Sequence, residues 1–287
     1  MSRAARPERE PLGLDREQLS TATFGTLRDL LHTHSGIALG AHKLTMVQSR
    51  LAKRLRILGL QTYEQYLDRL DGPTSAEWPE FINALTTNLT SFFREGHHFT
   101  RLVELLNPMT ASSRRLRIWS AGCSTGEEPY TLAMTLQKAF GTSIPVQILA
   151  TDLDTAVLQT AASGIYPLAR IDDLANEWKR LAFLKGTGTR EGRVCVRPEL
   201  RQLITFEQMN LLDDAWSVGN EPFQAIFCRN VMIYFDKPTQ KKLLKRFHSL
   251  LAPEGLLFVG HSEALLDTTL GFQSLGQTIY RRKAAGP

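Results

Sequence analysis

The sequence predicts an α/β protein with a doubly wound, mostly parallel sheet, a small antiparallel β insertion and a small N-terminal all-helical domain. Three observations predict this fold class. Helical periodicity dominates residues 15–106, strand-like and helical segments then alternate, and the alternation fails between about residues 165 and 210. The length of 287 residues agrees with two domains of roughly 150 residues each.

The N-terminal domain, residues 15–106, is predicted from apolar residues at helical spacing. Its predicted helices are Asp15 to Leu31, Leu44 to Leu58, Tyr63 to Leu70 and Trp78 to Leu89. Gly36 and Gly40 separate the first two helices, and the turn at 71–73 separates the last two. A small, polar and basic stretch at 110–115 marks the boundary, so the second domain is placed at residues 110–287.

The second domain is predicted from alternating strands and helices, which are typical of a parallel sheet. The predicted strands are Leu116 to Ser120, Val146 to Thr151, Phe223 to Cys228, Leu256 to Gly260 and a last one near Thr278 to Arg281. The predicted helices are Glu127 to Phe140, Asp154 to Ala162 and Lys237 to Leu251. Short apolar runs between glycines predict the insertion at 165–208, to which we assign Val194, Val196, Leu203, Ile204 and Phe206.

The composition excludes several classes of protein. Hydrophobic residues make up 43% and charged residues 22%, as in ordinary globular chains. No apolar run approaches the roughly 20 residues of a membrane-spanning helix, and residues 1–10 lack the apolar segment of a secretory signal. The three cysteines form no C-x-x-C pair, and no Cys/His spacing matches a metal site. We therefore expect a cytoplasmic protein without a metal and without insertion into a membrane.

A glycine-rich turn with the sequence S-A-G-C-S-T-G-E-E-P-Y spans residues 120–130, between a predicted strand and a predicted helix. Open α/β sheets bind ligands at such positions, but the G-x-G-x-x-G and G-K-[ST] motifs are absent. The turn also fits the G-x-S-x-G elbow of α/β-hydrolases, with Ser124, His261 and Asp213 or Asp214 as a triad. No H-G-G-G motif precedes the turn, and two glutamates at the helix start suit an oxyanion poorly. A hydrolase remains the weaker alternative.

Two further strands end in polar residues. Asp152 closes the segment I-L-A-T-D, where nucleotide-binding sheets carry an acid for the ribose hydroxyls. The alternative is a helix N-cap, for which Asp154 is the better candidate. The segment F-C-R-N-V-M-I-Y-F-D at 227–236 again follows a buried strand, and in T-T-N-L-T-S-F-F-R-E at 86–95 polar residues run into a paired aromatic and an arginine.

Together these motifs, with N-L-L at 210–212, resemble the CheR family of chemotaxis receptor methyltransferases, from about Leu19 to Tyr280. The resemblance implies a class I methyltransferase fold that binds S-adenosylmethionine (SAM). It implies methylation of glutamate side chains on the cytoplasmic domains of chemoreceptors, giving methyl esters and S-adenosylhomocysteine. We expect a monomer.

The resemblance also implies roles for individual residues. The cofactor-binding residues that match the family motifs are Asn88, Thr90, Arg94, Glu127, Asp152, Asn210, Leu211, Arg229 and Asn230. Within this set, Glu127 is expected at the methionine end of SAM and Asp152 at the ribose. Arg94 and Tyr234 match the catalytic pair beside the transferred methyl group. A glutamate carboxylate, with a pKa of about 4.3, is already ionised at neutral pH and needs no general base.

A cluster of basic residues predicts where the substrate docks. No acidic residue occurs between Asp29 and Glu64, whereas the segment contains Lys43, Arg50, Lys53, Arg54 and Arg56. Lys43, Arg50 and Arg54 fall within about 40° of one another beside an apolar helix face. A solvated helix face is the simpler interpretation, but an acidic helical receptor as substrate favours docking.

The insertion predicts a second contact with the receptor. Residues 193–197 alternate polar and apolar side chains, so we expect a strand with a free edge to which a peptide pairs. Arg193 and Arg197 would then contact an acidic residue. Some members of the family bind the receptor C-terminus at this subdomain, and a purely structural hairpin is the alternative.

Two other functions remain open for the whole chain. A net charge of +5 would suit a nucleic-acid methyltransferase, although no D-P-P-Y or N-P-P-Y tetrad is present, and we expect no nucleic-acid partner. A regulatory module that binds SAM without methyl transfer is the other alternative.

Overall fold

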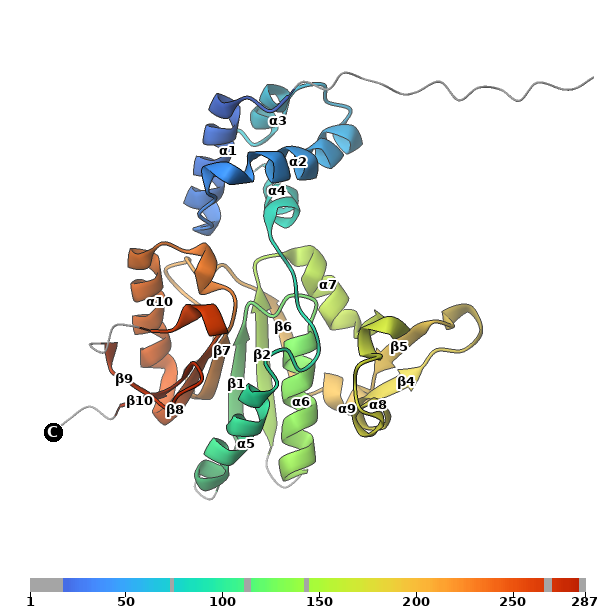
Figure 1. Ribbon diagram of the computed structural model, residues 1–287, viewed down its shortest axis with the longest axis vertical. Helices are drawn as coiled ribbons and strands as arrows, with labels where there is room; N and C mark the ends of the chain where they lie inside the picture. Colours follow the sequence, from blue (N-terminus) through green and yellow to red (C-terminus); the bar gives the residue numbers. More distant parts are fainter. Residues whose placement is uncertain (1–17, 73–74, 111–114, 142–144, 266–269, 284–287) are drawn as a thin grey trace, which may run out of the picture.

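The computed structural model describes residues 18–72, 75–110, 115–141, 145–265 and 270–283. A helical domain sits above the carboxyl ends of the strands of a sheet domain, and a small insertion projects from the side of the sheet (Figure 1). The predictions that concern residues 1–17, 73–74, 111–114 and 284–287 lie outside the described residues.

The helical domain consists of helices α1 to α4. These are α1 (Thr21–Ser35), α2 (Leu44–Leu58), α3 (Tyr63–Arg69) and α4 (Trp78–Leu85), with a 3-10 turn η1 (Ala41–Lys43) before α2. The Ser20 hydroxyl caps α1 by accepting from the backbone N–H of Thr23 at 3.0 Å. Leu27, Leu51 and Phe81 are fully buried in one core, as their helical spacing predicts.

The sheet domain is built on a seven-stranded sheet in the order β6-β2-β1-β7-β8-β10-β9. Its strands are β1 (Leu116–Ala121), β2 (Val146–Asp152), β6 (Ile204–Gln208), β7 (Phe223–Cys228), β8 (Leu251–Val259), β9 (Phe272–Ser274) and β10 (Ile279–Arg282). The first five strands in this order pair in parallel, and β10 is antiparallel to its neighbours. The prediction of a doubly wound, mostly parallel sheet is confirmed.

Helices cover both faces of this sheet. They are α5 (His97–Thr110), α6 (Glu127–Phe140), α7 (Thr155–Ser163) and α10 (Lys237–Leu250). Ile118 of β1 packs in one core with Phe99 of α5 and Leu132 of α6. Trp119, the next residue of β1, packs on the opposite side with Phe247 of α10. Successive residues of a strand point to opposite faces, so β1 is buried on both sides.

The insertion is a second, three-stranded antiparallel sheet in the order β3-β5-β4. It contains β3 (Ile165–Pro167), the 3-10 turn η2 (Leu168–Ile171), α8 (Asn176–Ala182), β4 (Phe183–Lys185), the 3-10 turn η3 (Gly188–Arg190) and β5 (Arg193–Val196), and α9 (Pro198–Arg201) follows. The small antiparallel element is thus confirmed, but two details of the prediction are wrong. Ile204 and Phe206 belong to the main sheet, where they align in parallel with Ile148 and Ala150 of β2. Strand β5 lies between β3 and β4, so it has no free edge.

The boundary between the two cores lies earlier than residue 110. Helix α5 was not predicted as an element of its own, although Phe99, Leu102 and Leu106 have helical spacing. These side chains are buried in the core of the sheet domain, whereas the core of the helical domain ends at Leu85. Residues 86–95 run between the two domains, and we call them the strap.

Candidate active site

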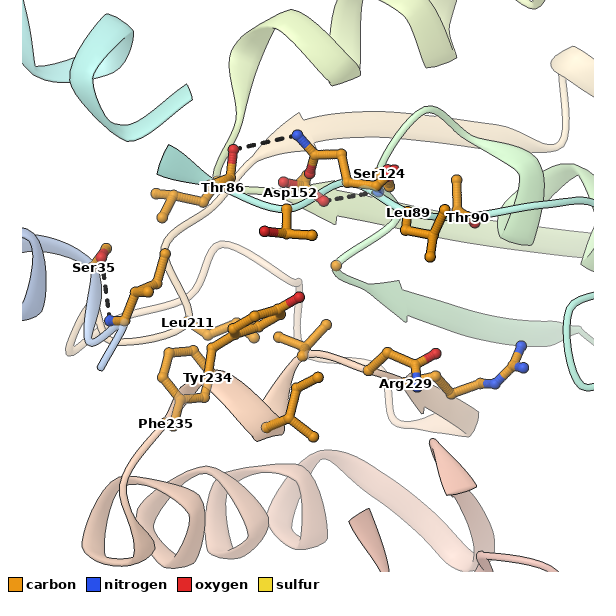
Figure 2. A pocket seen from close by; sticks show the side chains of 18 of the residues that line it. Ser35, Thr86, Leu89, Thr90, Ser124, Asp152, Leu211, Arg229, Tyr234 and Phe235 are labelled. Carbon is orange, nitrogen blue, oxygen red and sulfur yellow. Dashed lines mark hydrogen bonds between the residues drawn. The ribbon is translucent and has the colours of Figure 1, made fainter. Parts of the chain in front are cut away.

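A pocket of about 340 Å³ lies between the two domains, at the carboxyl ends of β1, β2 and β7 (Figure 2). Ligand pockets typically have volumes of about 300–1,000 Å³, and open α/β sheets bind ligands at this edge. The residues expected at the cofactor or the methyl group that line it are Asn88, Thr90, Arg94, Asp152, Asn210, Leu211, Arg229, Asn230 and Tyr234. Residues that lie far apart in the sequence thus meet at one pocket.

The glycine-rich turn forms the floor of the pocket, which Gly122 and Ser124 line. Gly122 has a φ of +93° and donates its N–H to the carbonyl of Thr151 at 2.8 Å. A Cβ at Gly122 would lie 2.3 Å from Cγ2 of Val231, so a larger residue would displace the segment that follows β7.

The hydrolase alternative does not agree with this geometry. The Ser124 hydroxyl donates to the carbonyl of Asn88 at 3.2 Å, and the ring of His261 lies 5.1 Å from that of His97. Within the described residues, no hydrogen bond joins Ser124, His261 and either Asp213 or Asp214. A triad needs its nucleophile and base within hydrogen-bond reach.

Asp152 and Asp154 have different roles at the end of β2. Asp154 caps α7, because its Oδ1 accepts from the N–H of Ala156 at 2.9 Å, as predicted. Asp152 lines the pocket instead; its Oδ2 accepts from the N–H of Ser124 at 2.8 Å and its Oδ1 from the N–H of Asp154 at 3.0 Å. Burial raises the pKa of the Asp152 carboxyl, and these backbone donors oppose that shift.

The two glutamates at the start of α6 point in different directions, and the role expected for Glu127 at the cofactor stays a prediction. Glu128 lines the pocket, whereas Glu127 has no exposed surface and does not line it. The Glu127 carboxylate accepts from the Thr125 hydroxyl at 2.6 Å and from the guanidinium of Arg170 in the insertion. Consecutive helix residues are about 100° apart, so only one of them faces the pocket. By position, Glu128 is the acid available to a ligand.

A buried ion network supports this wall of the pocket. Arg229 is 2% exposed in its side chain and pairs with Glu128 at 3.0 Å and with Glu95 at 3.2 Å. It also donates to the carbonyl of Arg94, which ties the end of β7 to the strap. Burial raises the pKa of the Glu128 carboxyl, and Arg229 only partly offsets this. Burial likewise pushes the pKa of Glu95 upward, but Arg229 together with His261 and His98 outweighs burial and holds that pKa below its ordinary value.

The helical domain forms the opposite wall, which the sequence-based prediction missed. Ile37, Leu39 and Met46 line the pocket from the α1–α2 connection and from α2. Two hydrogen bonds join the domains here: the Asn210 amide donates to the carbonyl of His34 at 2.8 Å, and the Ala38 N–H donates to the carbonyl of Tyr234 at 2.8 Å. The ring of Tyr234 faces the centre of the pocket (Figure 2). A single sequence offers no signal for such contacts beyond the glycines that break the helices.

The predicted docking residues do not share one surface. Arg50 donates to the carbonyls of Leu85 at 3.0 Å and Thr86 at 2.7 Å, so it caps the end of α4. Arg54, 16% exposed in its side chain, pairs with Glu77 at 2.8 Å and Glu80 at 2.9 Å. The remaining three divide between the rim of the pocket and solvent: Lys43 lines the pocket, and Lys53 and Arg56 are exposed on α2.

Arg193 and Arg197 also differ from each other. Arg193 is exposed on the central strand β5, whereas Arg197 is the N-cap of α9 and donates to the carbonyl of Arg180 at 3.3 Å. In the part of the chain that the structure describes, no cluster of three or more His, Cys, Asp or Glu side chains is placed to hold a metal ion. None of the described helices is long and apolar enough to cross a membrane.

Comparison with known proteins shows the family. Residues 22–86 match the model of the CheR methyltransferase all-alpha domain, and residues 88–281 match that of the CheR methyltransferase SAM binding domain. Chemotaxis protein methyltransferase 2 of Pseudomonas aeruginosa is 50% identical over 90% of this chain and 91% of that protein. The chemotaxis protein methyltransferases of Salmonella typhimurium and Escherichia coli are 48% and 47% identical, over 91% and 93% of this chain and 90% and 92% of theirs. The chain therefore belongs to the CheR methyltransferase family, and its sheet domain is a SAM-binding methyltransferase domain.

Proposed function

We propose that this protein methylates glutamate side chains on the cytoplasmic domains of chemoreceptors, with SAM as the methyl donor. The names of the relatives support a substrate in chemotaxis. The observation that carries the proposal is the pocket itself, in which an arginine and a tyrosine, Arg94 and Tyr234, lie beside the candidate cofactor residues. An ionised carboxylate needs orientation and desolvation rather than a base, and this residue set suits that task. A cytoplasmic location follows from the proposed substrate.

The pocket fits SAM on several independent grounds. Gly122 packs so closely against Val231 that a Cβ would clash with it, and both residues line the pocket, so bare backbone faces the space for a ligand. We assign Asp152 to the ribose hydroxyls, because its carboxylate is held at the end of β2 by two backbone donors. We assign Glu128 to the ammonium of the methionine moiety. Asn210 and Leu211 would flank the adenine, and Asn88, Thr90, Arg229 and Asn230 would close the site.

Bound SAM supplies an electrophilic methyl group: a glutamate oxygen bonds to the methyl carbon as the carbon–sulfur bond breaks, giving a methyl ester and S-adenosylhomocysteine. Arg94 would orient the carboxylate through its planar pair of donors. The Tyr234 hydroxyl has no hydrogen-bond partner among the described residues. It would donate to the same carboxylate or hold the attacking oxygen in line with the carbon–sulfur bond. The two domains exclude water from this contact, because residues of both line the pocket.

We infer that the substrate helix docks on the solvent face of α2. Lys53, Arg56 and Ile57 are exposed there, and Ile57 is 60% exposed, so the face combines positive charge with an apolar residue. A receptor tail peptide would have to pair at an outer strand of the insertion. Strand β4 is such an edge, with Leu184 and Lys185 exposed. We therefore propose pairing at β4 in place of β5, because β5 is the central strand of its sheet.

Incubation of the protein with labelled SAM and receptor-containing membranes tests the proposal. Label that is released as volatile methanol by mild base identifies glutamate methyl esters. Tyr234→Phe should lower kcat by about 10–100-fold, because a hydrogen bond to a charged group contributes roughly 1.5–3 kcal/mol. It should leave the affinity for S-adenosylhomocysteine within about twofold, because the backbone carbonyl that contacts Ala38 remains.

Two outcomes would contradict the proposal. Base-stable label in protein, or label in added nucleic acid, would favour another methyltransferase. Tight binding of S-adenosylhomocysteine without transfer to any receptor would favour the regulatory module.

A further inference from the structure

One arginine of the insertion reaches the wall of the cofactor pocket. Arg170 lies in the 3-10 turn η2, and its Nη2 donates to the carbonyl of Thr90 in the strap at 3.0 Å. The same nitrogen donates to the carboxylate of Glu127 at the start of α6. A single guanidinium therefore connects the insertion with two segments that border the pocket.

Glu127 fixes the position of this guanidinium. Its side chain is fully buried, and its second oxygen accepts from the Thr125 hydroxyl at 2.6 Å. A buried carboxylate requires a partner of opposite charge, and arginine stays charged and offers a rigid set of donors. Arg170 is partly exposed, with 39% of its side chain accessible, so the pair closes the pocket wall from the outside.

Aromatic packing forms a second contact between the insertion and the strap. The ring of Phe92 meets Tyr166 of β3 at 5.3 Å and Phe183 of β4 at 5.2 Å, both edge to face. The Tyr166 hydroxyl donates to the carbonyl of Thr125 in the glycine-rich turn at 2.6 Å. The insertion thus contacts both the strap and the turn, with the pocket on their far side.

We propose that Arg170 is a positioning residue for SAM, which acts through the carbonyl of Thr90. The strap supplies Asn88, Thr90 and Arg94 to the pocket, and Arg170 holds the backbone in the middle of this set. Loss of that bond lets the strap move away from the cofactor while leaving the floor of the pocket in place. The proposal rests on SAM binding, which the family shows, and is independent of the methyl acceptor.

Three variants separate positioning of the strap from neutralisation of Glu127. Arg170→Gln removes the charge and the bridge, and Arg170→Gln combined with Glu127→Gln also removes the unpaired buried carboxylate. The matched control is Arg190→Gln, which removes the same charge from an exposed position of the same insertion. Each variant is measured by calorimetry with S-adenosylhomocysteine, by hydrogen exchange of the amides of residues 90–94 without ligand, and by thermal unfolding.

Arg170→Gln should raise the dissociation constant about 10-fold, within the 5–150-fold typical of energetic coupling between sites, and speed exchange in the strap. It should also lower the melting temperature, because Glu127 is left unpaired. The double variant should recover the melting temperature but keep the weakened binding and the faster exchange. Arg190→Gln should change none of the three.

Two results would overturn the proposal. If the double variant bound S-adenosylhomocysteine as tightly as the wild type, Arg170 would serve only to neutralise Glu127. If strap exchange and affinity were unchanged in both Arg170 variants, Phe92 and its neighbours would hold the strap unaided. Folding defects in the single variant do not obscure the outcome, because the double variant carries no unpaired buried charge.

Discussion

The side-chain amide of Asn88 donates to Oδ2 of Asp154 at 2.7 Å, across a separation of 66 residues in the sequence. The Thr86 hydroxyl donates to the same oxygen at 2.8 Å, while the other oxygen of Asp154 caps α7. The strap is therefore anchored at this end by a buried carboxylate that does not line the pocket. Helix α4 stops at Leu85 because the polar residues after it bond to the sheet domain.

Replacement of Asp154 tests this anchor. Asp154→Ala should lower the free energy of unfolding by about 2–4 kcal/mol, since it removes an N-cap and leaves two donors without their acceptor. Asp154→Asn should recover about half of this loss, because asparagine is also a good N-cap. Chemical denaturation measures both. Equal stability of the alanine and asparagine variants would mean that the cap contributes nothing beyond the charge.

The neighbouring acids Glu128 and Glu127 provide a matched pair for the methionine end of the cofactor. Glu128→Gln should weaken binding of S-adenosylhomocysteine by about 10–100-fold, because a charge-assisted hydrogen bond contributes roughly 1.5–3 kcal/mol. Glu127→Gln should change it less than about twofold, since its amide oxygen still accepts from Arg170 and the strap stays bonded. Isothermal titration calorimetry distinguishes them. A larger loss in the Glu127 variant would reverse the assignment made from the pocket.

His98 predicts how stability depends on pH. It is fully buried, its Nε2 lies 2.9 Å from the carbonyl oxygen of Gln277, and burial lowers the pKa of its imidazole to about 4. Since the folded pKa lies below the unfolded value of about 6.5, the neutral ring stabilises the fold above pH 6.5. That contribution is lost as the pH falls towards 4 and amounts to roughly 3 kcal/mol at most. Arg229 and the neighbouring His97 act in the same direction, and Glu95 acts against it.

A comparison of wild type with His98→Gln separates the contribution of His98 to pH-dependent stability from the contributions of the carboxyl groups. Glu95, whose pKa is lowered, also makes the fold less stable as the pH falls. Glu128 and Asp152, whose pKa values are raised, have the opposite effect on the stability of the fold, and these carboxyls are present in both proteins. The difference in free energy of unfolding between wild type and variant should therefore shrink between pH 7 and pH 4. A difference that stayed constant over this range would mean that His98 does not titrate abnormally.

Much of the fold could be predicted because its signals are local. Helix α2 was predicted with the bounds that the structure shows, since Val47, Leu51 and Leu55 mark one face. Strand β6 was misassigned because a short apolar run looks the same in a parallel sheet and in an antiparallel insertion. Strand order depends on contacts between distant segments, so the central place of β5 could not be read from residues 193–197.

In the pocket too, local sequence patterns predict some residues, whereas others depend on contacts between distant segments. Its floor follows strand ends that hydrophobic patterns locate, and nearly all of the motif residues expected at the cofactor line it. The exception, Glu127, differs from Glu128 by one helix position, a rotation that sequence spacing alone does not orient. The wall from the helical domain depends on how two domains meet, through bonds such as that of Ala38 to Tyr234.

The basic helix α2 yields the last prediction, because the structure separates its exposed charges from its structural ones. Reversal of Lys53 and Arg56 to glutamate should raise the KM for the receptor roughly 10-fold at low ionic strength, through repulsion of an acidic helix. The KM for SAM should not change, since neither residue lines the pocket. Added salt should raise the receptor KM of the wild type and reduce the difference in KM between wild type and variant, because screening acts on exposed charges.

Two controls make this test specific to the face of α2. Arg69→Glu makes one such charge reversal on the exposed side of α3, to be compared with Arg56→Glu alone, and should leave the receptor KM within about twofold. Arg54→Ala should instead lower the stability of the helical domain by about 1–3 kcal/mol, because Glu77 and Glu80 lose a largely buried partner. Steady-state methylation with labelled SAM, together with thermal unfolding of each variant, separates the two effects. An equal rise of KM in the Arg69 variant would mean that net charge, rather than the surface of α2, attracts the receptor.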